Sequence, residues 1–535
     1  MKKILLIILL TISCIAWSQE DAWVYFTDKP DADFYLDNPL EMLSQKALDR
    51  RANQGIALDS KDVPLHEPYV TAIANAEGIT LMAKSKWMNV VHVRGSLEAI
   101  NALTGFDFVD YIDFANKALN TPGRSLQPLE PVTSDEITST EADFDYGLSA
   151  SQVTMLNGHL LHQQDYTGAG MTIAVLDSGF PGVDTAAPFQ RLYDNNLILG
   201  GYDFVADSED FYTADWHGTL VLSTMGGYAE GQLIGTAPDA FYYLFRTEDA
   251  TSENPVEESY WVEAAEVADS LGVDVINTSL GYFEYDNPDY SYTYEDINGQ
   301  TAFISRGADI AFSRGMICVT SAGNSGNTNN PHIGVPADAV NTLAVGAVNA
   351  EEIHSAFSST GPTYDMRVKP DVMAQGVAAV VSDTTGEIIA VNGTSFSGPI
   401  TAGLVACLWQ ALPNSTNAEI IQYVKQSADR YNNPDIQYGY GIPDFLIALD
   451  NGLSIPEKTK DSFILYPNPA ENYITVTNIP QEGDLLLYNN LGQVVIKAVV
   501  SHQNPVISLQ NITRGIYTYK IISGTKTQTG KIIKN

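Results

Sequence analysis

The spacing of apolar residues changes along the chain and predicts separate folded parts. Residues 20 to about 115 carry strand-type apolar runs at Ala22–Phe26 and Val90–Val93. Helical spacing occurs in the same part at Leu40–Gln54 and Leu97–Leu103. Together these elements predict a small α+β unit.

The part from about 145 to 450 alternates strand-type runs with helical stretches. The strand-type runs include Thr172–Leu176, Val273–Ile276 and Met316–Val319, and the helical stretches include Glu257–Ser270 and Gly398–Leu412. Strands that are apolar throughout and separated by helices are typical of a parallel sheet covered on both faces. This pattern predicts an α/β domain with a doubly wound parallel sheet.

Two further segments have patterns of their own. Residues 117–144 are rich in Pro, Ser, Thr and Glu, which predicts an exposed linker and a processing region. Residues 461–535 contain short segments with period-two alternation, such as Asp484–Tyr488 and Gly515–Ile522, and predict a small β-sandwich.

The strong net negative charge of the chain excludes some classes of binding partner. The 535 residues include 65 Asp and Glu against 28 Lys and Arg, a net charge of −37. Residues 461–535 hold six basic and four acidic side chains, so the acidity belongs to the parts before them. A surface this acidic repels nucleic acids and anionic membranes, and neither is expected as a partner.

The N-terminus has the parts of a signal peptide over residues 1–18. A basic start precedes an apolar run at Ile4–Ile12, and small residues stand at Ala16 and Ser18. A lipoprotein signal through Cys14 is the alternative. No later stretch reaches 18 apolar residues, so no membrane span is expected after removal of the signal.

Only Cys318 and Cys407 remain after the signal is removed. Two cysteines cannot form a disulfide framework. Both lie in apolar surroundings, so we expect buried free thiols rather than a catalytic cysteine.

Three motifs in the central part place reactive side chains at the ends of predicted elements. Asp177 ends a strand in VLDSG, where parallel sheets bind ligands. His217 opens HGT before an apolar helical stretch, and Ser395 lies in GTSFSGP at a helix start, where backbone N–H groups can stabilise an oxyanion. Taken singly, the three are also explained as a structural Asp, a loop and a helix N-cap.

The order Asp, His, Ser on a parallel-sheet pattern makes the set specific. The Gly-x-Ser-x-Gly elbow of α/β-hydrolases is not matched, because residue 397 is Ser. IAVLDSG, HGT and GTSFSGP resemble the three catalytic signatures of the subtilisin-like serine proteases, and the resemblance covers residues 145–452.

The resemblance implies further site residues. Asn324, in SAGN, is assigned to the oxyanion hole, and the backbone of Ser279, Leu280 and Gly281 is assigned to pairing with substrate. Gly323 and Gly334 are assigned to the substrate pocket. Three positions depart from the pattern of many relatives, namely Leu220 and Ile400 in place of His and Tyr282 in place of Gly. Tyr282 changes the expected shape of the substrate pocket, so the cleavage preference of relatives is not assigned to this chain.

The implied function is that of a serine endopeptidase acting on proteins or peptides. Ser395 attacks the peptide carbonyl, His217 moves the proton, Asp177 orients the imidazole, and Asn324 with the Ser395 N–H binds the oxyanion. The alternatives are a catalytically inactive surface-binding protein on a protease fold and an esterase; the intact residues argue against the first.

The flanking parts fit the same family. Residues 19–116 resemble its inhibitory pro-segment, which implies that the chain is made as a zymogen. LYPNP, LYNNLG and GIY within 461–535 resemble the C-terminal sorting domain of type IX secretion substrates in Bacteroidetes. The expected location is therefore extracellular or on the outer cell surface, with the pro-segment and the secretion machinery as partners. A carbohydrate-binding or spacer sandwich is the alternative for the tail.

Metal binding stays open at this stage. Catalysis is expected to need no cofactor, whereas structural calcium is compatible with two acidic loops and is bound by many relatives. No ligands are assigned. The loops contain Asp203, Asp207, Glu209, Asp210 and Asp215, and residues 284–296.

Overall fold

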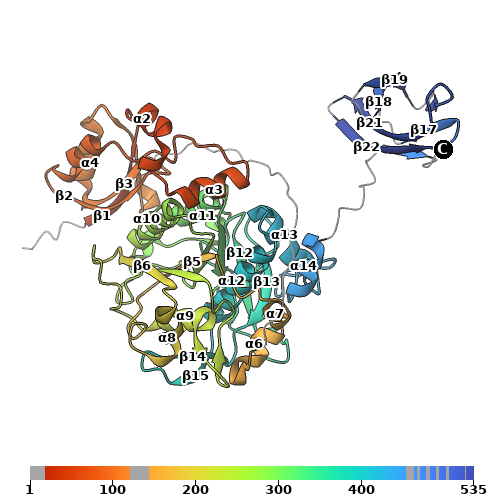
Figure 1. Cartoon of the computed structure of the whole chain (residues 1–535). Helices are drawn as coiled ribbons and strands as arrows, with labels where there is room; N and C mark the ends of the chain where they lie inside the picture. Colours follow the sequence, from red (N-terminus) through yellow and green to blue (C-terminus); the bar gives the residue numbers. More distant parts are fainter. Residues whose placement is uncertain are drawn as a thin grey trace, which may run out of the picture. The chain divides into compact units, whose positions relative to one another are not determined.

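The computed structural model describes residues 19–120 and 144–453 and, with short gaps, residues 463–535. The predicted signal peptide and most of the predicted linker lie outside the described residues. The chain forms two compact units, residues 1–453 and 454–535, which Figure 1 shows in sequence colours.

A seven-stranded parallel sheet lies at the centre of the first unit. Its strand order is β13-β12-β11-β10-β5-β9-β6, and all neighbours are parallel. Strands β10 to β13 follow one another outward on one side of β5, and β9 and β6 lie on its other side, which confirms the predicted doubly wound sheet. The strands are β5 (Thr172–Asp177), β6 (Ile198–Asp203), β9 (Phe241–Arg246), β10 (Val275–Thr278), β11 (Ile317–Ser321), β12 (Leu343–Val348) and β13 (Val372–Gln375).

Helices cover both faces of this sheet because alternate strand residues point in opposite directions. Ile173 and Val175 of β5 belong to the same buried cluster as residues of α9 (His217–Gly226) and α12 (Thr394–Ala411). Ala174 and Leu176 pack instead with α10 (Val256–Leu271) and α11 (Phe303–Ser313).

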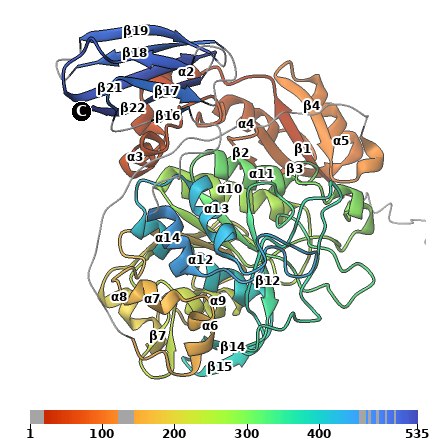
Figure 2. The same ribbon diagram turned by 90° about the vertical axis from the view of Figure 1, so that its right-hand side faces the viewer.

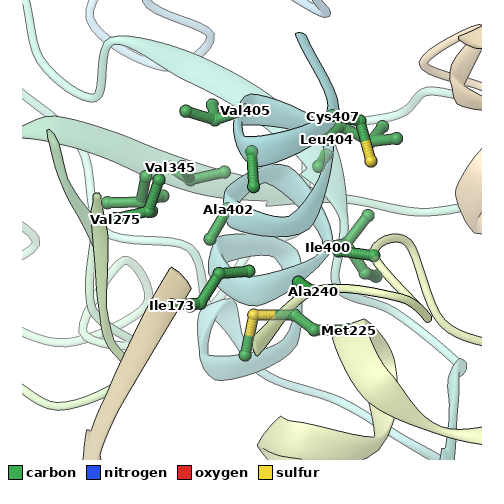
Figure 3. Close-up of a cluster of buried hydrophobic side chains, with 14 of the residues drawn as sticks. Ile173, Met225, Ala240, Val275, Val345, Ile400, Ala402, Leu404, Val405 and Cys407 are labelled. Atoms are coloured by element: carbon green, nitrogen blue, oxygen red, sulfur yellow. The ribbon is translucent and has the colours of Figure 1, made fainter. Parts of the chain in front are cut away.

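Helix α12 is the most deeply buried of these helices, with apolar side chains around its whole circumference. Figure 3 shows Ile400, Ala402, Leu404 and Val405 packed among strand residues and Met225 of α9. Apolar burial of this kind stabilises the fold by about 1.5–3 kcal/mol for each large side chain. The position of α12 is therefore fixed by the core.

Shorter elements complete the unit. Among the described residues, no helix is both long and apolar enough to cross a membrane. The additional elements after residue 144 include α6 (Ala150–Thr154), α7 (Gly158–His162), α8 (Gln190–Asp194), α13 (Asn417–Ser427), α14 (Phe445–Leu453), β7 (Tyr228–Ala229), β8 (Leu233–Ile234), β14 (Ala379–Ser382) and β15 (Ile388–Val391).

The N-terminal part is a four-stranded antiparallel sheet with the order β2-β3-β1-β4. One face packs on α4 and α5, and the other places Trp23 and Tyr25 in the cluster of α10 and α11. Figure 2 shows the ribbon diagram turned by 90° from the view of Figure 1. The elements of the N-terminal part include β1 (Gln19–Phe26), α4 (Glu67–Ala74), β2 (Ile79–Ser85), β3 (Val90–Ser96), α5 (Leu97–Ala102) and β4 (Val109–Phe114).

The helix predicted over Leu40–Gln54 is wrong in its first turn. A 3-10 turn, η1 (Pro39–Glu41), comes first, and α3 begins only at Gln45 and ends at Asn53. Ser44 Oγ accepts the N–H of Ala47 at 3.2 Å, and this cap fixes the later start.

The C-terminal unit consists of two antiparallel sheets with the orders β16-β17-β20 and β19-β18-β21-β22. Ile474 and Ile507 from the first sheet share one core with Leu485 and Ile521 from the second, which confirms the predicted β-sandwich. The strands are β16 (Ile464–Tyr466), β17 (Tyr473–Thr477), β18 (Gly483–Tyr488), β19 (Val494–Val500), β20 (Val506–Ser508), β21 (Gly515–Ser523) and β22 (Lys526–Lys534).

Candidate active site

Asp177 and His217 form a hydrogen-bonded pair at the carboxyl end of β5. Asp177 is the last residue of the strand and is 1% exposed. His217 Nδ1 lies 2.8 Å from Asp177 Oδ1. The same oxygen accepts the N–H of Ser178 at 2.8 Å, which holds the carboxylate toward the imidazole.

The residues next to His217 set the position of its ring. Asp215 Oδ1 accepts the N–H of His217 at 3.0 Å and so binds the start of α9. Gly218 allows α9 to approach the end of β5, because a Cβ at this position would lie 2.4 Å from Gly179 O. The glycine of the HGT motif is therefore required by close packing.

Ser395 lies in the first turn of α12, where two serines bind the helix to the sheet. Pro399 has no N–H, so the carbonyl of Ser395 lacks its helical donor. That carbonyl accepts instead from Ser279 Oγ at 3.0 Å, just after β10. The carbonyl of Thr394 accepts from Ser321 Oγ at 2.8 Å, at the end of β11. Both strand ends therefore hold the start of α12.

Asn324 is oriented by the same helix turn. The N–H and the hydroxyl of Thr394 donate to Asn324 Oδ1 at 2.9 and 3.0 Å. A backbone N–H requires the oxygen of the amide, so the Nδ2 group of Asn324 points away from Thr394. Gly323 has a φ of +103°, a backbone conformation that favours glycine. The Ser395 N–H has no helical acceptor, since it lies in the first turn.

The segment Ser279–Gly281 continues beyond β10 toward a short antiparallel pairing. Tyr282 N–H donates to Val335 O at 2.9 Å, and Val335 N–H donates to Tyr282 O at 3.0 Å. Gly334 must lack a side chain, because a Cβ would lie 2.8 Å from Tyr282 O. Ser279 is buried, Leu280 is half-buried and Gly281 is exposed, so the segment reaches the surface at its end.

Tyr282 itself is fixed inside the domain. Its side chain is 1% exposed, its hydroxyl donates to Glu248, and its ring stacks on Tyr285 with 5.8 Å between centroids. Burial, with the nearby Glu257 and Glu253, raises the pKa of Glu248 well above its ordinary range. A buried tyrosine–carboxyl pair therefore supports the backbone after Gly281.

The Ser395 hydroxyl is not bound to the imidazole in this structure. Ser395 Oγ donates to the carbonyl of Ser279 at 3.4 Å, which is long for an O–H···O bond. Within the described residues there is no hydrogen bond between Ser395 Oγ and His217. The ring of His217 nevertheless lies 5.9 Å from that of Phe396, the residue after Ser395.

Two opposing effects act on the pKa of His217. Burial disfavours the imidazolium and lowers the pKa, whereas the charges of Asp177 and Asp215 and the bond to Asp177 raise it. The carboxylates prevail, and the pKa of His217 lies above its ordinary value. The imidazole is thus a stronger base than a free one.

The acidic loop before His217 is engaged in other contacts. Asp203 pairs with Arg246 at 2.8 Å, Asp207 accepts a tyrosine hydroxyl at 2.5 Å, and Asp215 binds the start of α9. In the part of the chain that the structure describes, no group of three or more His, Cys, Asp or Glu side chains could hold a metal ion. Structural calcium stays a prediction without ligands.

Sequence analysis assigned no role in the site to Thr394, Asp215 and Glu248, which support it. Thr394 and Asp215 carry a signal, since one lies inside GTSFSGP and the other two positions before His217. Glu248 carries none, because 34 positions separate it from Tyr282.

Three family models match the chain. The subtilase family model matches residues 168–441, about half of the chain. A peptidase S8 propeptide domain of Bacteroidota matches residues 21–130. A secretion system C-terminal sorting domain matches residues 464–535 and indicates secretion.

Two curated relatives and one solved structure are similar to this chain. Subtilisin E of Bacillus subtilis is 32% identical over 293 residues, which span 54% of this chain and 68% of the relative. Subtilisin of Bacillus pumilus is 31% identical over 293 residues, 54% of this chain and 94% of the relative. The structure of MycP1 from Mycobacterium smegmatis matches with 21% identity and a TM-score of 0.45, over 62% of this chain and 94% of that one. The chain belongs to the subtilase family of serine peptidases, and its propeptide makes it a zymogen.

Proposed function

We propose that the protein is a secreted serine endopeptidase that hydrolyses peptide bonds through Asp177, His217 and Ser395 and an acyl-enzyme. The observation that carries the proposal is the 2.8 Å bond between His217 Nδ1 and Asp177, with the His217 ring 5.9 Å from that of Phe396, next to Ser395. Membership of the subtilase family supports the same three residues.

In the first half-reaction the Ser395 Oγ attacks the carbonyl carbon of the peptide bond. His217 Nε2 takes the hydroxyl proton, and the carbonyl π electrons move to the oxygen. The Asn324 side-chain amide and the Ser395 N–H bind that oxyanion. The C–N bond then breaks, and His217 gives the proton to the leaving amine.

In the second half-reaction a water replaces the amine. His217 takes a proton from the water, whose oxygen attacks the ester carbon of the acyl-enzyme. The ester bond breaks, and Ser395 regains its proton from His217. Asp177 stays ionised throughout and stabilises the imidazolium that forms in each half-reaction.

Substrate recognition follows from the backbone of Ser279–Gly281, which reaches the surface at Leu280 and Gly281. An extended peptide can add to such an edge through main-chain hydrogen bonds. We expect Gly323 and Gly334 to line the substrate pocket beside it. Main-chain pairing needs no free terminus, and this favours cleavage within a chain.

Maturation and export use the flanking parts. We expect the enzyme to cut its own chain after the pro-segment, and the type IX secretion machinery to take the sorting domain across the outer membrane. No cofactor takes part in the steps above.

Ser395→Ala should give a full-length precursor that does not mature. The alanine has no oxygen to attack the chain, so the variant should run above the wild type on a denaturing gel by the mass of the pro-segment.

A fluorophosphonate should label the wild type only. Normal maturation of the variant in a host without other proteases would contradict self-processing, and an unlabelled wild type would favour the inactive binder. Activity on a p-nitrophenyl ester but not on casein would favour an esterase.

Asn324→Leu should lower kcat by about 10²–10³ with little change in KM, because its hydrogen bond strengthens only as negative charge develops. Steady-state kinetics on a peptide substrate measure both constants. Asn329→Leu, an exposed residue of the same loop, is the matched control. Wild-type kcat in the Asn324 variant would remove it from the oxyanion hole.

Asp177→Asn should move the acid limb of kcat/KM to lower pH and reduce kcat by about 10⁴. Catalysis needs neutral His217, so activity is present above the raised pKa of His217 and is lost as the pH falls through it. Without the Asp177 charge, burial lowers that pKa. A pH profile with Asp215→Asn as a weaker comparison tests this, and an unmoved acid limb would show that another group titrates.

Deletion of residues 463–535 should leave peptidase activity intact and stop export, because the tail is a separate compact unit with its own core. Fractionation of the native host should find the truncated protein in the periplasm, active on casein after lysis. Loss of specific activity in a folded truncation would make the tail part of the enzyme.

A further inference from the structure

The pro-segment carries an additional arm, residues 27–66, between β1 and α4. The arm contains α2 (Ala32–Asp37), η1 and α3. It has a small apolar core of its own around Met42, Leu43 and Val63. None of its residues belongs to the four-stranded sheet.

The arm binds the amino ends of three strands of the central sheet. Lys46 Nζ donates to Thr172 Oγ1 at 2.5 Å and to Asp274 Oδ2 at 2.9 Å. Gln54 Nε2 donates to the carbonyl of Gly315 at 2.8 Å. Thr172 begins β5, Asp274 directly precedes β10, and Gly315 lies two residues before β11.

The arm is therefore remote from the candidate active site. Asp177, Ser279 and Ser321 lie at or just beyond the carboxyl ends of the same three strands. A six-residue strand such as β5 is about 17 Å long. The arm cannot block the site, so its contacts serve attachment.

Reciprocal buried ion pairs form the centre of this attachment. Arginines of the arm bind an aspartate of α10, and an arginine that follows α11 binds aspartates of the arm. Asp269 and Asp62 are fully buried, and Arg51 is nearly so. The pairs across the contact are Arg50–Asp269, Arg51–Asp269 at 2.7 Å, Arg314–Asp59 at 3.0 Å and Arg314–Asp62 at 3.4 Å, and Arg51–Asp62 at 2.8 Å is a further pair within the arm.

The carboxylate of Asp269 depends on the arm. Among the described residues it accepts hydrogen bonds only from Arg50 and Arg51. Departure of the arm leaves this carboxylate without its cationic partners, which is costly until water reaches it. The site selects a partner that presents two adjacent guanidinium groups together with a carboxylate for Arg314.

We propose that the arm is the element that keeps the pro-segment on the peptidase part after the chain between them has been cut, and that Arg50 and Arg51 on Asp269 are its main anchor. The partner of this surface is the chain's own detached pro-segment. The proposal rests on the proposed function only for the identity of the protease that makes the cut.

The test uses the full chain with Ser395→Ala and a recognition sequence for an added site-specific protease placed within residues 121–143. The added protease makes the cut, so a failure of self-processing does not affect the result. A denaturing gel verifies the cut, and gel filtration over time measures how fast the pro-segment leaves.

The parent chain should keep its pro-segment through gel filtration. Arg50→Gln with Arg51→Gln should release it about 10²-fold faster or more, the effect of removing one side of a buried ion pair. Lys61→Gln is the matched control, because it removes a positive charge from the arm but Lys61 forms no ion pair within the described residues.

Should the double arginine variant fail to fold, Lys46→Gln with Gln54→Ala replaces it. Both side chains are partly exposed, and the variant should still release the pro-segment at least 10-fold faster than Lys61→Gln. Immediate release from the parent, or equal release rates in the parent, the arm variants and Lys61→Gln, would overturn the proposal. Equal slow release would assign the attachment to the sheet face on α10 and α11.

Discussion

The start of α12 is the constraint on which the site depends. The core fixes this helix along its length, and Pro399 removes one N–H from its early turns. The carbonyl of Ser395 is thereby available to Ser279 Oγ, while the preceding carbonyl accepts from Ser321 Oγ. Two parallel strands end beside this turn, so their terminal side chains reach it without any long loop. The position of Ser395 is a consequence of sheet and helix packing rather than of local sequence alone.

The two ends of the central sheet have separate roles. The carboxyl ends of β5, β10 and β11 bring Asp177, Ser279 and Ser321 to the start of α12. The amino ends of the same strands are held by the arm of the pro-segment through Lys46 and Gln54. Parallel strands allow this division because all of their carboxyl ends lie at the same end of the sheet. The arm of the pro-segment binds the opposite end, so it can stabilise the sheet without touching the reacting atoms.

Sequence analysis could predict the elements that depend on local pattern. The strands β5 and β11 and the helices α10 and α12 follow from the periodicity of apolar residues. Close packing explains the glycines of the motifs, as at Gly218. It could not predict contacts between polar residues far apart in the chain. Arg51 and Asp269 are 218 positions apart, and both look like ordinary surface charges in a list of residues. The hydrogen bond between Tyr282 and Glu248 could not be predicted either, because 34 positions separate the two residues. The late start of α3 at Gln45 was missed because the cap at Ser44 outweighs the apolar spacing before it.

The environment of Asp177 shows why the pair with His217 must be kept together. The carboxylate is buried, and its Oδ2 has no hydrogen-bond partner among the described residues. Its Oδ1 accepts from the Ser178 N–H and is bound to His217 Nδ1. A buried carboxylate with so few donors is costly unless a cation forms beside it. Each proton that His217 accepts supplies that cation, so the strain of burying Asp177 is relieved when the imidazolium forms. This coupling explains how the carboxylates raise the pKa of His217 although burial alone would lower it.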